Sequence, residues 1–243
     1  MEQPSNICLL MLTHTMNSHL WSYLQMLKRS SQGIMDLYVL YDCAGGKPDI
    51  LYGNDIPFHL FSSSDLPNFF HRGERQLPNP LLALIDFAHS HKYDRYLLME
   101  NDIVLSGDWC SFLKIIEREY DTDYIHIASD VLGGPLMHWP AKFIRRSPFL
   151  KLYFSWCQLF LVSHCYLMDL ESFMQQNDSF YYEFLLPTMA YNGDYLVRQF
   201  ENFGYNFQVS WGPVECYENK YQYERQNNTF YHPIKHLGIV DLA

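Results

Sequence analysis

The sequence has no long run of basic residues. Its 17 lysines and arginines are outnumbered by 27 acidic residues, which gives a formal net charge of −10, and neither Lys nor Arg occurs in blocks longer than a pair. A protein that binds nucleic acid across a broad face needs clustered cations to neutralise the phosphates. The charge pattern therefore predicts no nucleic-acid partner.

Long apolar runs are missing as well. Hydrophobic residues make up 48% of the chain, yet none of their runs approaches the roughly 20 residues that cross a bilayer. The first five residues are polar and lack the basic and apolar regions of a signal peptide. These features predict a cytoplasmic protein with no transmembrane segment, and they leave peripheral membrane association open.

Cysteine is scarce and scattered. The six cysteines form no C-x-x-C pair, and several of them fall within apolar runs. This spacing fits neither a zinc knuckle nor a disulfide framework. We expect reduced thiols, packed as small apolar side chains in the core.

Helical and strand periodicities alternate along the chain. Residues 7–12 predict a buried strand, a helix follows with Asn17 or Ser18 as its cap, and residues 35–41 predict a second strand, so the chain opens as β-α-β. Further strands are predicted over 58–61, 124–127, 156–162 and 207–210, and one more runs from residue 96 to the carboxylates at 100 and 102. Helices are predicted over 79–89, 108–120, 169–175 and 183–192. In the last helix, Pro187 predicts the start of the regular part. A chain of 243 residues in this pattern is long enough for one large α/β domain.

Two carboxylates, Glu100 and Asp102, lie one residue apart where a buried strand ends. Side chains at i and i+2 can face the same way there, and carboxylate oxygens are the ligands that Mg²⁺ and Mn²⁺ prefer. In open α/β sheets, ligands bind at the carboxyl ends of the strands. Acidic residues at such a place also commonly begin a turn or cap the next helix. The pattern indicates a divalent-metal site of the kind that holds a diphosphate.

The order of these elements resembles a GT-A type glycosyltransferase, without identifying a subfamily. The residue-level resemblance lies in segments 93–103 (YDRYLLMENDI), 106–109 (SGDW), 183–188 (EFLLPT) and 231–236 (YHPIKH). It implies one GT-A-like α/β domain over residues 1–243, a Rossmann-like mixed sheet flanked by helices. Residues 1–132 would form the donor and metal-binding half, and residues 133–243 the acceptor side.

The resemblance implies transfer of a sugar from a nucleotide-diphosphate sugar, a UDP- or GDP-sugar, to a hydroxyl acceptor such as a glycan or a lipid-linked compound. A bound Mn²⁺ or Mg²⁺ would neutralise the diphosphate and stabilise it as the leaving group. The usual motif is Asp-x-Asp, whereas here Glu100 stands first, and strand alternation also allows Glu100 to point away and leave Asp102 as the main ligand. A late histidine often completes such a site. His232 or His236 would do so, and we prefer His232 because Pro233 fixes its backbone.

Seven residues are implied to bind the donor: Thr13, His14, Asp42, Arg72, Arg75, Asn101 and Lys235. The two that end the first strand would line the base pocket, and the aspartate that ends the second would accept hydrogen bonds from ribose or base. The asparagine lies between the two metal carboxylates, and the three cations would face the phosphates. The alternative for each is an ordinary solvated surface residue.

Inverting transfer also requires a base to take the proton of the acceptor hydroxyl, and a carboxylate suits that role. Glu183 is our candidate because it lies among aromatic residues before a helix, well downstream of the metal motif. Asp194 is the reserve. Either residue can instead serve as a cap or a turn residue.

Two other function classes compete with this interpretation. A nucleotidyltransferase acting on a sugar phosphate normally needs a Gly-rich basic loop after the first strand, and residues 13–17 (THTMN) offer neither glycine nor Lys or Arg. A catalytically inactive GT-A-like sugar-binding protein would explain the unusual Glu100. Metal-dependent binding of a nucleoside diphosphate separates an active transferase from such a protein.

Overall fold

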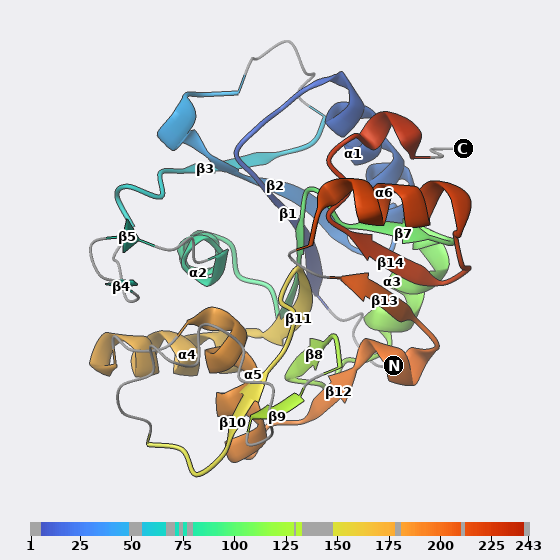
Figure 1. Cartoon of the computed structure of the whole chain (residues 1–243). Helices are drawn as coiled ribbons and strands as arrows, with labels where there is room; N and C mark the ends of the chain where they lie inside the picture. Colours follow the sequence, from blue (N-terminus) through green and yellow to red (C-terminus); the bar gives the residue numbers. More distant parts are fainter. Residues whose placement is uncertain are drawn as a thin grey trace.

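The computed structural model describes residues 6–48, 55–66, 71–72, 75–76, 80–128, 130–132, 148–177, 181–209 and 212–240. Its centre is a seven-stranded mixed sheet, which confirms the predicted α/β fold (Figure 1). The strands, in the order in which they pair, are β12 (Val197–Gln199), β8 (Tyr124–His126), β11 (Leu159–Ser163), β6 (Arg95–Glu100), β1 (Ile7–Thr13), β2 (Asp36–Asp42) and β3 (Phe58–Phe61). β6, β1, β2 and β3 run parallel, whereas β11 runs antiparallel to β6 and β8.

Two apolar cores lie on opposite faces of this sheet, because successive side chains of a strand point to opposite sides. In β1, Leu9 and Met11 join one core, whereas Cys8 and Leu10 join the other. The first core is covered by α1 (Ser18–Ser31) and α3 (Trp109–Glu117). The second is covered by α2 (Pro80–Ser90), α4 (His164–Gln176) and α5 (Tyr182–Asn192), as Figure 1 shows.

The local signals read from the sequence explain where several elements begin. The Asn17 side chain accepts a hydrogen bond from the Leu20 amide at 2.9 Å and so caps α1. Asp108 caps α3 in the same way, through the amides of Cys110 and Ser111. The predicted β-α-β opening is confirmed, because β1 and β2 pair in parallel and α1 connects them.

A second sheet was only partly predicted. It contains β13 (Asn206–Val209), β14 (Thr229–His232) and β7 (Val104–Ser106) in the order β13-β14-β7, and α6 (Val214–Tyr223) lies beside it (Figure 1). The sequence analysis found β13 but missed β14 and α6. Because β7 follows β6 after a short turn, this sheet joins the end of the chain to the end of the central strand.

The remaining elements are short. They are the strand pairs β4 (His71–Arg72) with β5 (Arg75–Gln76) and β9 (Asp130–Leu132) with β10 (Leu152–Phe154), and the 3₁₀ turns η1 (Cys43–Gly45), η3 (Phe200–Phe203) and η4 (Leu237–Ile239). Among the described residues, no helix has the length and apolar character that a membrane span requires.

Some sequence predictions were wrong in position. α4 begins five residues earlier than predicted, at His164, and β11 begins three residues later than the strand predicted over 156–162. The strand predicted to end at the carboxylates is confirmed as β6, and a short separate strand, β7, follows them. Of the cysteines expected in the core, Cys8 and Cys157 are buried, whereas Cys165 and Cys216 are exposed.

The prediction that the regular part of α5 begins at Pro187 was also wrong, because the helix begins at Tyr182 and contains the proline. A proline has no amide to bond the carbonyl four residues before it. Here that carbonyl belongs to Glu183, and it accepts a hydrogen bond from the Ser155 amide at 3.1 Å instead. Tertiary packing therefore satisfies the group that the proline leaves free.

His126 in β8 is a buried histidine. Its Nε2 lies 3.0 Å from the Tyr191 hydroxyl, and its Nδ1 lies 3.2 Å from the Ser155 hydroxyl. Burial lowers the pKa of His126 from 6.5 to about 4. The histidine therefore stays neutral in the folded protein at pH values where the unfolded chain takes up a proton.

We predict that this difference weakens the fold as the pH falls from about 6.5 to about 4, by up to about 3 kcal/mol at the acid end. His126→Gln removes the titrating group, so the free energy of unfolding should fall less steeply over this window. The measurement is urea unfolding at a series of pH values. His19→Gln, at an exposed histidine, is the matched control. An unchanged slope in His126→Gln would contradict the assignment.

Candidate metal site

Glu100 and Asp102 converge because the chain turns between them. Glu100 is the last residue of β6, and the Ile103 amide bonds back to the Glu100 carbonyl at 3.3 Å. The Asn101 amide reaches the Leu12 carbonyl of β1 at 3.2 Å, which ties the turn to the sheet. Asp102 is 3% exposed, so one of the two carboxylates is nearly closed to solvent.

His232 reaches this turn through strand pairing. β14 runs antiparallel to β7 with Tyr231 opposite Val104, so the next residue of β14 lies beside the turn. The Nε2 atom of His232 is 3.2 Å from Glu100 Oε2 and 3.3 Å from Asp102 Oδ1. Ligand atoms of all three residues lie within 4.8 Å of one another, the one such cluster among the described residues.

The charges of the cluster are strongly coupled. Burial alone would lower the pKa of His232, but its hydrogen bonds and ion pairs with Asp102 and Glu100 raise it to about 9. Burial alone would raise the pKa of Asp102, but His232 and Lys235 lower it to about 2. The Lys235 ammonium contacts the second oxygen of Asp102, while its side chain is half exposed. Two cations therefore balance two carboxylates.

The residues fit a divalent ion by the chemistry of their donors. Two carboxylates and one imidazole are a ligand set that suits Mn²⁺ and also Mg²⁺. The imidazole nitrogen that would bind the ion already faces both carboxylates, and metal ligation requires it in neutral form, so a bound ion would take the place of its proton. Glu100, Asp102 and His232 are thus the residues that can hold a metal.

Glu183 lies in the first turn of α5 and is completely buried. Its Oε1 accepts a hydrogen bond from Gln158 Nε2 at 3.3 Å, whereas its Oε2 is a buried atom without a hydrogen-bond partner. Burial, and then the negative charge of Glu100, raise the pKa of Glu183 well above 4.5. The carboxyl therefore lies within electrostatic reach of Glu100, and both effects favour its neutral form over its charged form.

Gln158 was missed by the sequence analysis. Its backbone carbonyl accepts a hydrogen bond from the Glu100 amide at 2.9 Å, so Gln158 contacts both the end of β6 and Glu183. Its own Oε1 is buried and without a partner. A lone glutamine inside the apolar run 156–162 was the available signal, because a buried amide needs polar partners.

The predicted donor residues near the first two strands have different surroundings. Thr13 is buried, and its hydroxyl bonds the Thr15 carbonyl at 2.9 Å, whereas His14 is exposed. Asp42 Oδ1 accepts the amides of Ala44 and Ser63 at 2.9 and 3.0 Å. That oxygen is therefore already occupied by the backbone. Asn101 is half-buried in the turn between Glu100 and Asp102.

The other predicted site residues divide into two groups. Lys235 lies at the cluster, where its ammonium contacts the carboxylate of Asp102. His236 does not join the cluster, because its Nδ1 pairs with Glu218 Oε2 at 2.8 Å and its side chain is exposed. Asp194 is exposed in the turn after α5. The side chains of Arg72 and Arg75 lie outside the described part of the structure.

Comparison with known proteins gives similarity in structure alone. No protein-family model and no curated protein sequence matches the chain. Among solved structures, a 4-diphosphocytidyl-2C-methyl-D-erythritol synthase from Anaerococcus prevotii is 8% identical with a TM-score of 0.49, covering 81% of this chain and 89% of its own. The galactosyltransferase LgtC, in complex with donor and acceptor sugar analogues, is 12% identical with a TM-score of 0.42, covering 79% and 72%.

The glycosyltransferase GlyE of Streptococcus pneumoniae is 10% identical with a TM-score of 0.40, covering 80% of this chain and 45% of its own. The similar structures thus include both glycosyltransferases and nucleotidyltransferases. Similarity at this level assigns no activity to the chain, so a function has to be argued from the site.

We predict that Asp102→Asn weakens Mn²⁺ binding by at least about 100-fold, since even partners that only orient a ligand are worth 10- to 100-fold. Isothermal titration calorimetry at pH 7.5 measures the affinity. Asp121→Asn removes an equal charge from an exposed position and should bind like the wild type. Equal affinities for wild type and Asp102→Asn would remove Asp102 from the metal site.

Proposed function

We propose that this protein is a glycosyltransferase that moves a sugar from a UDP- or GDP-sugar to the hydroxyl of a carbohydrate or other acceptor, assisted by Mn²⁺ or Mg²⁺. The observation that supports this most is the convergence of Glu100, Asp102 and His232 within 4.8 Å, with a buried carboxyl, Glu183, in electrostatic reach. The first group suits a diphosphate-bound cation, and the second suits proton transfer.

In this mechanism the donor diphosphate is held by opposite charge. Glu100, Asp102 and His232 would hold a divalent ion, whose charge would stabilise the leaving diphosphate. Lys235 supplies a further cation, because its half-exposed ammonium contacts Asp102 and can turn to a phosphate oxygen nearby. Both His232 and Lys235 come from the end of the chain, so the donor site draws on residues beyond the 1–132 half.

Glu183 is the proposed base, with Asp194 in reserve. A base has to be ionised when the acceptor hydroxyl loses its proton, and the pKa of Glu183 is raised by burial and by Glu100. Glu100 would lose this repulsive effect once it held a cation, so Glu183 would then ionise more readily. Because Glu183 is shielded from solvent, the acceptor has to displace the side chains that cover its free oxygen.

A thermal-shift panel tests the substrate class. UDP or GDP should raise the unfolding midpoint only with Mn²⁺ present, because without the ion the two cations of the site are already paired with its carboxylates. A ligand at a hundred times its Kd adds about 2.7 kcal/mol to the stability of the fold. Stabilisation by nucleoside triphosphates but not by nucleoside diphosphates would favour a nucleotidyltransferase. Metal-independent binding of sugars alone would favour a non-catalytic sugar-binding protein.

Glu183→Gln should lower the rate of transfer by roughly 100-fold or more, the scale of positioned general-base catalysis. Donor affinity and stability should barely change, since glutamine resembles the neutral carboxyl that the fold already holds. Initial rates with saturating donor and calorimetry with UDP and Mn²⁺ measure the two quantities. Glu224→Gln, at an exposed glutamate, is the matched control. Transfer at the wild-type rate would rule out Glu183 and move the search to Asp194→Asn.

A further inference from the structure

The end of the chain that carries His232 and Lys235 is held by an unusual set of bonds. After β14 ends at His232, residues 233–236 belong to no helix or strand. Backbone amides in such a segment still need partners when they are shielded from water. The Ile234 amide donates a hydrogen bond to the Asp102 carbonyl at 2.9 Å, which connects the segment to the turn that carries Glu100 and Asp102.

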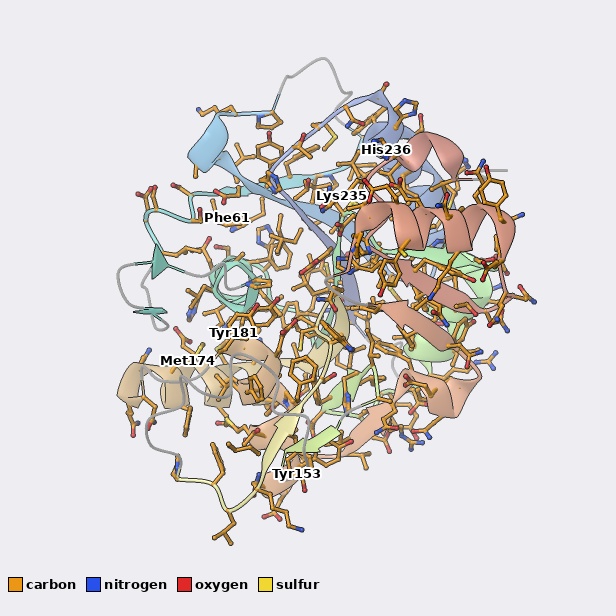
Figure 2. All side chains as sticks on the ribbon, in the orientation of Figure 1. Phe61, Tyr153, Met174, Tyr181, Lys235 and His236 are labelled. Carbon is orange, nitrogen blue, oxygen red and sulfur yellow. The ribbon has the colours of Figure 1, made fainter. Side chains whose placement is uncertain are left out.

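The next two amides bond a single side chain on α6. Glu218 Oε1 accepts the Lys235 amide at 2.8 Å and the His236 amide at 2.7 Å, and Oε2 lies 2.8 Å from His236 Nδ1. In Figure 2, Lys235 and His236 lie next to this helix, in the upper half of the view. The three partner groups belong to adjacent residues, so one carboxylate fixes the course of the chain at this place.

Glu218 differs from Glu215, the other acidic residue of α6. It is 9% exposed, whereas Glu215, one turn earlier in α6, is exposed and bonds none of these amides. A carboxylate is costly to bury unless hydrogen bonds replace its water. The bonds from Lys235 and His236 provide that replacement, and this makes the position of the segment and the burial of Glu218 depend on each other.

We propose that Glu218 is a positioning residue of the metal site, which holds the segment 232–236 so that His232 faces Glu100 and Asp102 and Lys235 reaches Asp102. Among the described residues, the hydrogen bonds of Glu218 go to Lys235 and His236 and not to Glu100, Asp102 or His232. Together with the bond between Ile234 and Asp102, it acts by fixing the backbone that carries the two cationic side chains. The inference rests on the metal site of the proposed function.

Two substitutions separate the position of this carboxylate from its charge. Glu218→Asp keeps the charge but withdraws the oxygens by one methylene, so the bonds to both amides are strained or lost. Glu218→Gln keeps an oxygen at the same reach but removes the charge. We expect Glu218→Asp to weaken Mn²⁺ binding about 10-fold, the lower end of the range for groups that orient a ligand. Glu218→Gln should stay within about threefold of the wild type.

Calorimetry with Mn²⁺ on the full chain measures these affinities, and amide hydrogen exchange on the metal-free protein measures the anchoring of residues 234–236. Glu218→Asp should lose protection at Lys235 and His236, whereas the control Glu215→Asp should change neither quantity. Lost protection with wild-type Mn²⁺ affinity would show that Glu218 only stabilises the fold and would overturn the proposal. A larger loss in Glu218→Gln than in Glu218→Asp would overturn it as well, in favour of a charge effect.

The same experiment separates this proposal from the proposed function. Wild-type protein that binds no Mn²⁺ would refute the metal site, and the role of Glu218 with it. Wild-type protein that binds Mn²⁺, with Glu218→Asp binding equally well, would refute the role of Glu218 alone.

Discussion

Two carboxylates in a largely buried turn require opposite charge close by, because an unpaired buried charge is unstable in a folded protein. The chain meets this requirement by pairing β14 with β7, which brings His232 and Lys235 from the end of the sequence to Glu100 and Asp102. The second sheet therefore does more than cover a face of the first. It assembles an acidic site whose members no local segment of the chain contains.

The proposed base, Glu183, depends on a different constraint. Pro187 leaves the Glu183 carbonyl without its helical partner, and the Ser155 amide takes that place. The connection between β10 and β11 is thereby fixed against the first turn of α5. Gln158, three residues later, bonds the Glu183 side chain and accepts the Glu100 amide. The short segment from Ser155 to Gln158 thus bonds both Glu183 and the end of β6.

The sequence predicted the parts of this molecule that local physics determines. The first strands, the cap of α1 and the carboxylate turn follow from apolar periodicity, capping residues and spacing, and all are present. The partners of those residues could not be predicted, because they depend on strand register and on contacts between distant segments. Both His232 and His236 matched the late-histidine pattern, and their contacts separate them: His232 faces Glu100 and Asp102, whereas His236 pairs with Glu218. Lys235 was expected on a phosphate, and its contact with Asp102 follows from the tertiary fold.

The position of Lys235 links charge balance to binding order. In the ligand-free protein, His232 and Lys235 together neutralise Glu100 and Asp102, so the site carries little net charge although the chain carries −10. If this site takes up a divalent ion, as the proposed function requires, His232 would have to give up its proton, and the Lys235 ammonium would be able to leave Asp102 for an anion. Under that proposal the site would bind a diphosphate only after the cation, because without the ion each positive charge already has a partner.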